Sequence, residues 1–204
     1  STPKPSSAAS DVYKRQGYLS AGPFVPEVVL EHPEVVTQLH REFIRAGSDV
    51  VQAFTYYGHR EKLRIIGKED MLEPLQKNAL KIAKDAANEF KDLDLMVCGD
   101  VANTNVFDPG DANTHKQCQQ MYEEQIAWAK EAGVDFVIAE TINWTEEMKI
   151  ALKAIKDAGL IAVCNFAIPR GDKTREGHSA EDACKMMEDL GADVVGLNCY
   201  RGPE

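Results

Sequence analysis

Several absences in the sequence narrow the class of protein. No apolar run approaches the ~18 residues that a membrane-spanning helix needs, so we expect no membrane partner. The formal net charge is −10 and no basic stripe is present, which argues against nucleic acid as a partner. The five cysteines form no Cys-x-x-Cys pair, and we recognise no signal peptide. Together these absences indicate a reducing, cytoplasmic location.

Two further absences concern cofactors and metals. No glycine-rich phosphate loop follows any predicted strand, which weakens the interpretation as a nucleotide-binding open sheet. The histidines show no metal-type spacing such as His-x-x-x-His, so we expect each to be a surface or helix-capping residue. They are His32, His40, His59, His115 and His178.

The composition is that of an ordinary globular protein. With 204 residues, of which 44% are hydrophobic and 27% charged, the chain can form one domain with a sizeable core. The composition is also compatible with a homo-oligomer. The first ten residues are small and polar, and residues 11–16 resemble the translated end of a sequencing-library adapter. We therefore expect residues 1–16 to be a non-native or disordered leader before a domain at 17–204. The sequence stops at Glu204, just after a predicted strand, which suggests an internal fragment.

Strand-like and helical segments alternate along the chain. Apolar runs rich in β-formers predict five strands, at residues 49–56, 95–102, 134–141, 161–168 and 193–199. Apolar residues at helical spacing predict five helices, at residues 35–44, 71–90, 118–129, 145–155 and 179–190. Glycines such as Gly47 and Gly133 should end helices directly before a strand. Thr145 can cap one helix, and Ser179 with Asp182 predicts a capping box on another.

This alternation predicts parallel βαβ units, arranged either as an open doubly wound sheet or as a barrel. Polar residues gather just past several strand ends, which is typical of βα-barrels, where each strand contributes to one site. They are Tyr57, His59, Asn103, Asn105, Glu140, Asn198 and Cys199. The sequence therefore favours an α/β barrel with its site at the carboxyl ends of the strands.

Individual site candidates have two interpretations each. Cys199 ends an apolar strand and can be a metal ligand, but a single cysteine is also a common apolar filler. Glu140 ends a buried strand, where a carboxylate is costly unless it pairs with a substrate ammonium or with a basic side chain. Asn103 and Asn105 follow a strand and either contact substrate or form a turn.

The order of these motifs resembles the homocysteine S-methyltransferase family, most closely its betaine–homocysteine branch, over nearly all of residues 17–204. Residues 57–63 look closer to bacterial members than to animal ones. The matching stretches are Gly17–Phe24, Glu31–Glu34, Leu39–Phe43, Gln52–Tyr57, Asp135–Glu140 and Gly196–Cys199.

The resemblance implies a (βα)8 TIM barrel with a zinc ion held by three cysteines, of which the present chain contains about strands 2–6. Cys199 stands in the family's Gly-x-Asn-Cys motif and is the implied zinc ligand. The other two ligands belong to a Gly-Gly-Cys-Cys-Gly motif that the 204 residues do not contain. An Asp-Gly-Gly motif is expected just upstream of Gly17. The other cysteines match no ligand; they are Cys98, Cys118, Cys164 and Cys184.

The resemblance also implies the substrates. Glu140 and Asn198 fall at homocysteine-binding positions, whereas Phe24 and Tyr57 align with aromatic residues that hold the methyl donor. Aromatic faces attract quaternary ammonium groups such as that of betaine. The implied reaction is zinc-dependent methyl transfer from betaine to the homocysteine thiol, giving methionine and dimethylglycine.

Three alternatives stay open. Thr141 stands where animal members have a tyrosine that helps to bind betaine, so S-methylmethionine or another sulfonium could be the donor. The 204 residues by themselves could instead be a non-catalytic, zinc-free fragment of a methyltransferase, which is our expectation for this stretch in isolation. An unrelated βα-barrel lyase is the remaining alternative.

Overall fold

The structure is a computed structural model that describes residues 26–168 and 171–199. The chain divides into two compact units, residues 1–98 and 99–204. Each unit has its own buried apolar side chains, such as Ile44 and Leu75 in the first and Val137 and Ile155 in the second. The leader predicted at residues 1–16 lies outside the described residues. No helix in the described part of the chain is long and apolar enough to cross a membrane.

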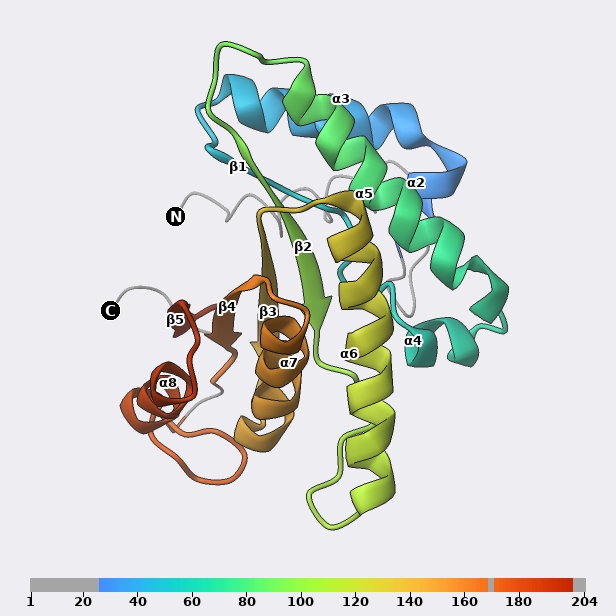
Figure 1. The fold of residues 1–204 in the computed structure, drawn as a ribbon. Helices are drawn as coiled ribbons and strands as arrows, with labels where there is room; N and C mark the ends of the chain where they lie inside the picture. Colours follow the sequence, from blue (N-terminus) through green and yellow to red (C-terminus); the bar gives the residue numbers. More distant parts are fainter. Residues whose placement is uncertain (1–25, 169–170, 200–204) are drawn as a thin grey trace. The chain divides into compact units, whose positions relative to one another are not determined.

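The N-terminal unit is mainly helical. Its described elements are α2 (Val28–Glu31), α3 (Pro33–Arg45), β1 (Val50–Gln52), α4 (Arg60–Ile65), the short 3₁₀ helix η1 (Glu69–Met71), α5 (Leu72–Asn88) and the start of β2 (Met96–Ala102). Helices α3 and α5 pack against each other (Figure 1), because each turns an apolar stripe inwards. Val36 and Ile44 lie on the buried face of α3, and Ala79 and Ala86 lie on that of α5.

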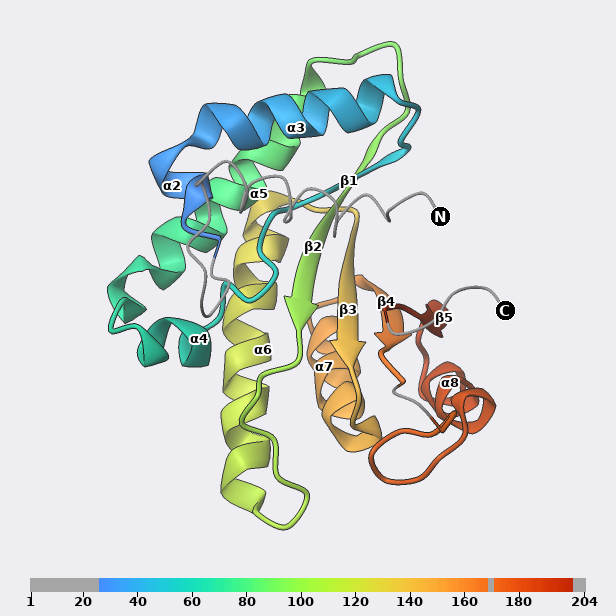
Figure 2. The same cartoon turned by 180° about the vertical axis from the view of Figure 1, so that it is seen from behind.

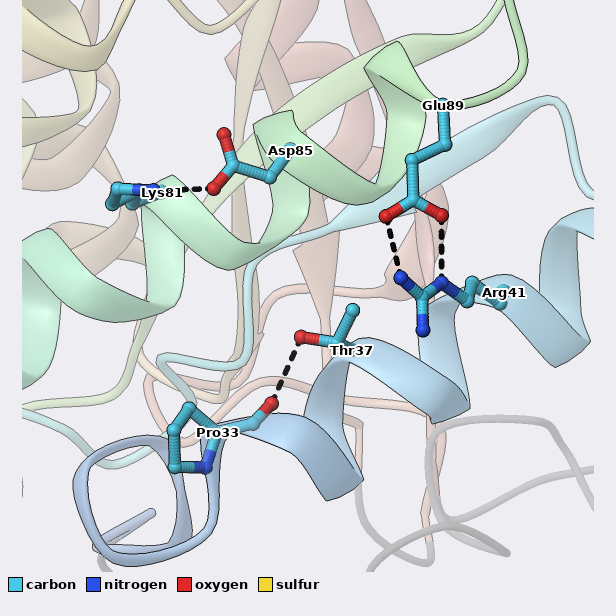
Figure 3. A network of polar contacts seen from close by, with 6 residues as sticks. All are labelled: Pro33, Thr37, Arg41, Lys81, Asp85 and Glu89. Carbon is cyan, nitrogen blue, oxygen red and sulfur yellow. Dashed lines mark hydrogen bonds and ion pairs between the residues drawn. The ribbon is translucent and has the colours of Figure 1, made fainter.

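One ion pair joins α3 to the end of α5. The Arg41 guanidinium donates two hydrogen bonds of 2.6 Å to the Glu89 carboxylate, in the bidentate geometry that arginine favours (Figure 3). The pair lowers the pKa of Glu89 through this hydrogen bond. Figure 3 also shows Thr37, whose hydroxyl donates to the Pro33 carbonyl at 2.9 Å within α3. The ion pair is partly exposed, so it aligns the two helices more than it stabilises them.

The C-terminal unit alternates strands and helices. After the second half of β2 come α6 (Ala112–Ala132), β3 (Phe136–Ile142), α7 (Thr145–Asp157), β4 (Ile161–Phe166), α8 (Ala180–Asp189) and β5 (Val194–Leu197). Helix α7 packs against β3 and β4, and α8 packs against β4 and β5 (Figure 1). Figure 2 shows β3 and β4 side by side from behind.

All strand pairings that the structure gives are parallel, in the order β1-β2-β3-β4-β5. Val50 of β1 pairs with Met96 of β2, and Ala139 of β3 pairs with Cys164 of β4. Because each connection passes through a helix, the predicted parallel βαβ pattern and the α/β class are confirmed. The register of β3 with β4 is interrupted between Glu140 and Ile142, at the end of β3.

The predicted helix ends largely hold. Four glycines, each one or two residues past the end of a helix, have φ between +69° and +96°, a region that only glycine adopts freely. Ser179 accepts a hydrogen bond from the Asp182 N–H at 3.0 Å, and its hydroxyl donates to the Asp182 carboxylate at 2.7 Å, so the predicted cap is confirmed. The four glycines are Gly47, Gly133, Gly159 and Gly191.

The prediction that Thr145 caps its helix is wrong. Thr145 is the first residue of α7, and Trp144 stands at the cap position without a side-chain hydrogen bond. The Glu176 carboxylate accepts from the N–H groups of Thr145 and Glu146, at 2.9 and 3.0 Å. A distant carboxylate thus satisfies two free donors at the positive end of the helix dipole. The Thr145 hydroxyl donates instead to that of Thr174, at 3.2 Å.

The prediction that every histidine is a surface or capping residue is also wrong. His40 is 6% exposed, because its helical spacing from Val36 and Ile44 places it on the buried face of α3. Burial lowers the pKa of His40 to about 4 and keeps the ring neutral. His59 precedes α4 at the cap position, but it is 1% exposed and makes no capping hydrogen bond.

Candidate functional site

A polar cluster lies at the carboxyl ends of β3 and β5 in the C-terminal unit. Asn198 follows β5, and its side-chain Nδ2 donates to the Glu140 carboxylate at 2.6 Å and to the Thr141 hydroxyl at 2.9 Å. The Thr141 N–H donates in turn to Asn198 Oδ1 at 3.1 Å. One asparagine therefore joins the ends of two strands and fixes the orientation of the Glu140 carboxylate.

Gly196 packs closely against the neighbouring strand next to this cluster. A Cβ atom at position 196 would lie 2.9 Å from Oδ1 of Asn165, which is in the neighbouring strand β4. Any larger residue there would displace Asn165 or move β5. Glycine at position 196 of the Gly-Leu-Asn-Cys segment is therefore explained by steric fit, which is separate from the chemistry of Asn198 and Cys199.

The backbone at the ends of β3 and β5 is strained. Thr141 has φ +60° and Cys199 has φ +57°, which are left-handed values. Such values are uncommon for residues other than glycine and are costly for a β-branched threonine. Thr141 is held there because Asn198 accepts from its N–H and Asn103 donates to its carbonyl, at 3.1 Å each. Strain maintained by neighbouring hydrogen bonds is typical of functional sites.

The thiol of Cys199 is exposed at the end of this cluster. Its Sγ lies 3.8 Å from the Thr141 hydroxyl, and the cysteine is not in a disulfide. Among the residues that the structure describes, no group of three or more His, Cys, Asp or Glu side chains could hold a metal ion. The described donor set therefore offers one thiol and does not by itself form a zinc site.

The two asparagines after β2 have different environments. Asn103 lies against the strand ends, where its Nδ2 donates to Thr141; its Oδ1 is buried and has no hydrogen-bond partner among the described residues. Asn105 is exposed, has φ +63°, and donates to the carbonyl of Asn103 at 3.3 Å. Asn105 thus stabilises a turn, whereas Asn103 belongs to the polar cluster.

Tyr57 lies in the N-terminal unit, where its ring already contacts a cation. The Lys62 ammonium is 4.2 Å from the centroid of the Tyr57 ring, within cation–π range. Tyr56 packs beside the same ring, at 4.4 Å between centroids, and His59 meets it edge-on at 6.0 Å. Burial lowers the pKa of Lys62. Tyr57 also has a left-handed backbone, with φ +59°.

The structure thus brings together some of the predicted site residues. Glu140, Asn198 and Cys199 share one polar cluster, Tyr57 stands in the other unit, and Phe24 lies outside the described residues. Glu147 was not among the predicted site residues, although it is a buried hydrogen-bond acceptor. The sequence signal for this burial is helical spacing, because Glu147 and Ala151 are four residues apart and share the buried face of α7.

Polar side chains at the carboxyl ends of parallel strands are typical of α/β proteins, both barrels and open sheets. The sequence profile of the homocysteine S-methyltransferase family matches residues 11–204, and the chain belongs to this family. The predicted family is confirmed.

Two similar proteins illustrate the relationship. The chain is 33% identical over 195 residues to betaine–homocysteine S-methyltransferase 1 of Xenopus tropicalis, covering 93% of this chain and 47% of that protein. It is 34% identical to the enzyme of that name from Rattus norvegicus, covering 46% of it. The chain therefore spans about half the length of these relatives.

A solved structure shows the fold. The metallated form of the homocysteine methyltransferase MmuM from Escherichia coli matches 91% of this chain and 70% of its own, with a TM-score of 0.77 and 17% identity. The five parallel strands described here are thus part of a TIM barrel. The predicted incomplete (βα)8 barrel is confirmed.

Proposed function

We propose that the complete protein containing this chain transfers a methyl group to the thiol of homocysteine, giving methionine. The observation that carries the proposal is the cluster of Glu140, Asn198 and Cys199 at the carboxyl ends of two barrel strands. Family membership and the names of the similar proteins support the same reaction.

Each residue of the cluster has a role in this proposal. Glu140 pairs with the ammonium of homocysteine, and the Asn198 amide holds that carboxylate in position through its 2.6 Å hydrogen bond. Cys199 stands where the substrate sulfur would approach. The residues bind and orient the amino acid so that its thiol faces the methyl donor.

Zinc is the proposed cofactor of the complete protein. When bound by three cysteines, zinc leaves one position open for a substrate thiol and favours its thiolate form. Cys199 would be one ligand, and the other two would come from a Cys-Cys segment that the 204 residues do not contain. The described residues do not fit a zinc ion on their own.

Betaine is the proposed methyl donor, which would add dimethylglycine as a product. Tyr57 and Phe24 would face its quaternary ammonium, and the Lys62 contact supports the capacity of the Tyr57 ring to hold a cation. S-methylmethionine or another sulfonium is the second candidate, because Thr141 offers a hydroxyl at a position where we expect a tyrosine in animal members.

A donor panel tests this function. The complete protein, loaded with zinc, is incubated with homocysteine and either betaine, S-methylmethionine or dimethylsulfonioacetate, and methionine is measured. We expect methionine with betaine at the highest kcat/KM. A higher kcat/KM with a sulfonium compound would identify that compound, instead of betaine, as the donor. If no donor yields methionine, homocysteine methylation is refuted.

We also propose domain boundaries and a cellular location for the protein. We propose residues 17–204 as part of a homocysteine-binding barrel domain and residues 1–16 as a leader, of which residues 11–16 fall within the match to the family profile. A cytoplasmic location is proposed because the cysteines in the described residues are all free thiols. Methionine biosynthesis is the corresponding cellular role.

A further inference from the structure

A second, buried polar network lies beneath the strand ends of the C-terminal unit. Glu147 in the first turn of α7 is 1% exposed, and Thr104, in the loop after β2, is fully buried. The Thr104 N–H and hydroxyl both donate to Glu147 Oε1, at 2.8 and 2.6 Å. The Tyr122 hydroxyl on α6 donates to the same oxygen at 3.2 Å. Three donors thus converge on one buried carboxylate oxygen.

A buried carboxylate is costly, so its presence needs a reason. Burial raises the pKa of Glu147 above its usual range, and the hydrogen bonds from Thr104 oppose this shift. Apolar side chains could fill the same space at lower cost. Since two of the three donors belong to one loop residue, the network mainly fixes the position of Thr104.

Thr104 is also held from α6. Its hydroxyl proton points to Glu147, so the Cys118 thiol donates to Thr104 Oγ1, at a separation of 3.1 Å. The loop after β2 is therefore fastened to α6 and α7 through a single side chain. Burial raises the pKa of Cys118 to about 11, which keeps it a thiol and a donor.

The fastened loop leads directly to the candidate site. Asn103 precedes Thr104 and donates to the Thr141 carbonyl, and the Thr141 N–H donates to Asn198, which holds Glu140. A continuous series of hydrogen bonds and peptide links therefore runs from Glu147 to Glu140. The Asn103 side chain joins this series through its Nδ2, which donates to the Thr141 carbonyl at 3.1 Å, and its backbone is bonded directly to Thr104.

We propose that Thr104 and Glu147 are positioning residues for homocysteine binding, acting through Asn103 and Thr141 on the Asn198–Glu140 pair. This inference rests on the proposed function. Neither residue touches the substrate; the pair keeps the left-handed Thr141 backbone in the conformation that presents its N–H to Asn198. Loss of the Thr104 anchor should weaken homocysteine binding without affecting the donor.

The test compares matched variants of the complete protein. Thr104→Val removes the hydroxyl at nearly constant shape, and Thr104→Ser restores it. Tyr122→Phe removes another donor from the same Glu147 oxygen but has no link to Asn103. We expect Thr104→Val to raise the homocysteine KM about tenfold, as for a misaligned hydrogen bond between Glu140 and the substrate ammonium. The KM for betaine should stay within about twofold, and Thr104→Ser and Tyr122→Phe should resemble the wild type.

Hydrogen exchange provides a readout that does not depend on activity. The Thr141 amide should exchange faster in Thr104→Val than in Tyr122→Phe, because only the first loosens the loop that orients Thr141. Should Thr104→Val not fold, Asn103→Ala cuts the series one step later and is expected to have the same effects.

Two outcomes separate this inference from the proposed function. Equal effects of Thr104→Val and Tyr122→Phe on homocysteine KM and on exchange at Thr141 would overturn the positioning role and leave a purely structural network. A wild-type protein that does not methylate homocysteine, with the expected exchange pattern, would refute the function while supporting the connection from Thr104 to Thr141.

Discussion

Glu140→Gln is the most informative single change at the site. Glutamine keeps an acceptor for the Asn198 amide, which now donates to Glu140 at 2.6 Å, so the local geometry should persist. The charge is lost, and with it the proposed pairing to a substrate ammonium. A hydrogen bond between charged groups contributes about 2 kcal/mol, which corresponds to roughly a 30-fold rise in the homocysteine KM.

The assay is steady-state methylation by the complete protein, with homocysteine and donor varied separately and zinc content measured by metal analysis. The donor KM and a zinc content of about one per chain should be unchanged, as expected for a single tetrahedral site. Glu146→Gln is the matched control, because Glu146 is an exposed glutamate on α7 that pairs with Lys149. Loss of zinc or of folding in Glu140→Gln would refute the substrate role and show that the carboxylate is structural.

Three further changes test other parts of the account. Tyr57→Ala should raise the betaine KM about 5- to 30-fold, as for a lost cation–π contact of 1–2 kcal/mol, and equal effects on both substrates would indicate packing. Gly196→Ala should lower the free energy of unfolding in urea by about 1 kcal/mol, and Asn165→Ala in the same chain should restore most of it; no loss would contradict the steric reason. His40 has a depressed pKa of about 4, so wild-type stability should fall as the pH drops from 6.5 towards 4, by about 3 kcal/mol, while His40→Leu should remove most of this dependence. An unchanged pH profile in His40→Leu would contradict the buried neutral histidine.

Periodicity and turn chemistry predicted the fold to a large extent. Glycines at the helix ends and apolar runs placed five parallel strands, because both signals are local in sequence. Strand ends were less accurate: β1 ends at Gln52, since Ala53 makes a last bond to Cys98 before the chain turns at Thr55. The Glu176 cap on α7 was not predictable, because its partners are 30 and 31 residues away in the sequence.

The sequence predicted which residues form the candidate site better than it predicted the contacts between them. Glu140, Asn198 and Cys199 follow from strand ends and from family resemblance. The Asn103–Thr141 contact and the burial of Glu147 depend on tertiary packing between separate loops and helices. Thr141 is the clearest case, because no sequence rule predicts a left-handed threonine that three neighbouring hydrogen bonds maintain.

The most direct test of the central claim is a crystal structure of the complete protein with zinc and homocysteine. We expect the substrate ammonium about 3 Å from the Glu140 carboxylate, with the substrate sulfur and the Cys199 thiolate on the same metal ion. Homocysteine bound elsewhere, or Cys199 turned away from the metal, would contradict the assignment of this cluster as the homocysteine site.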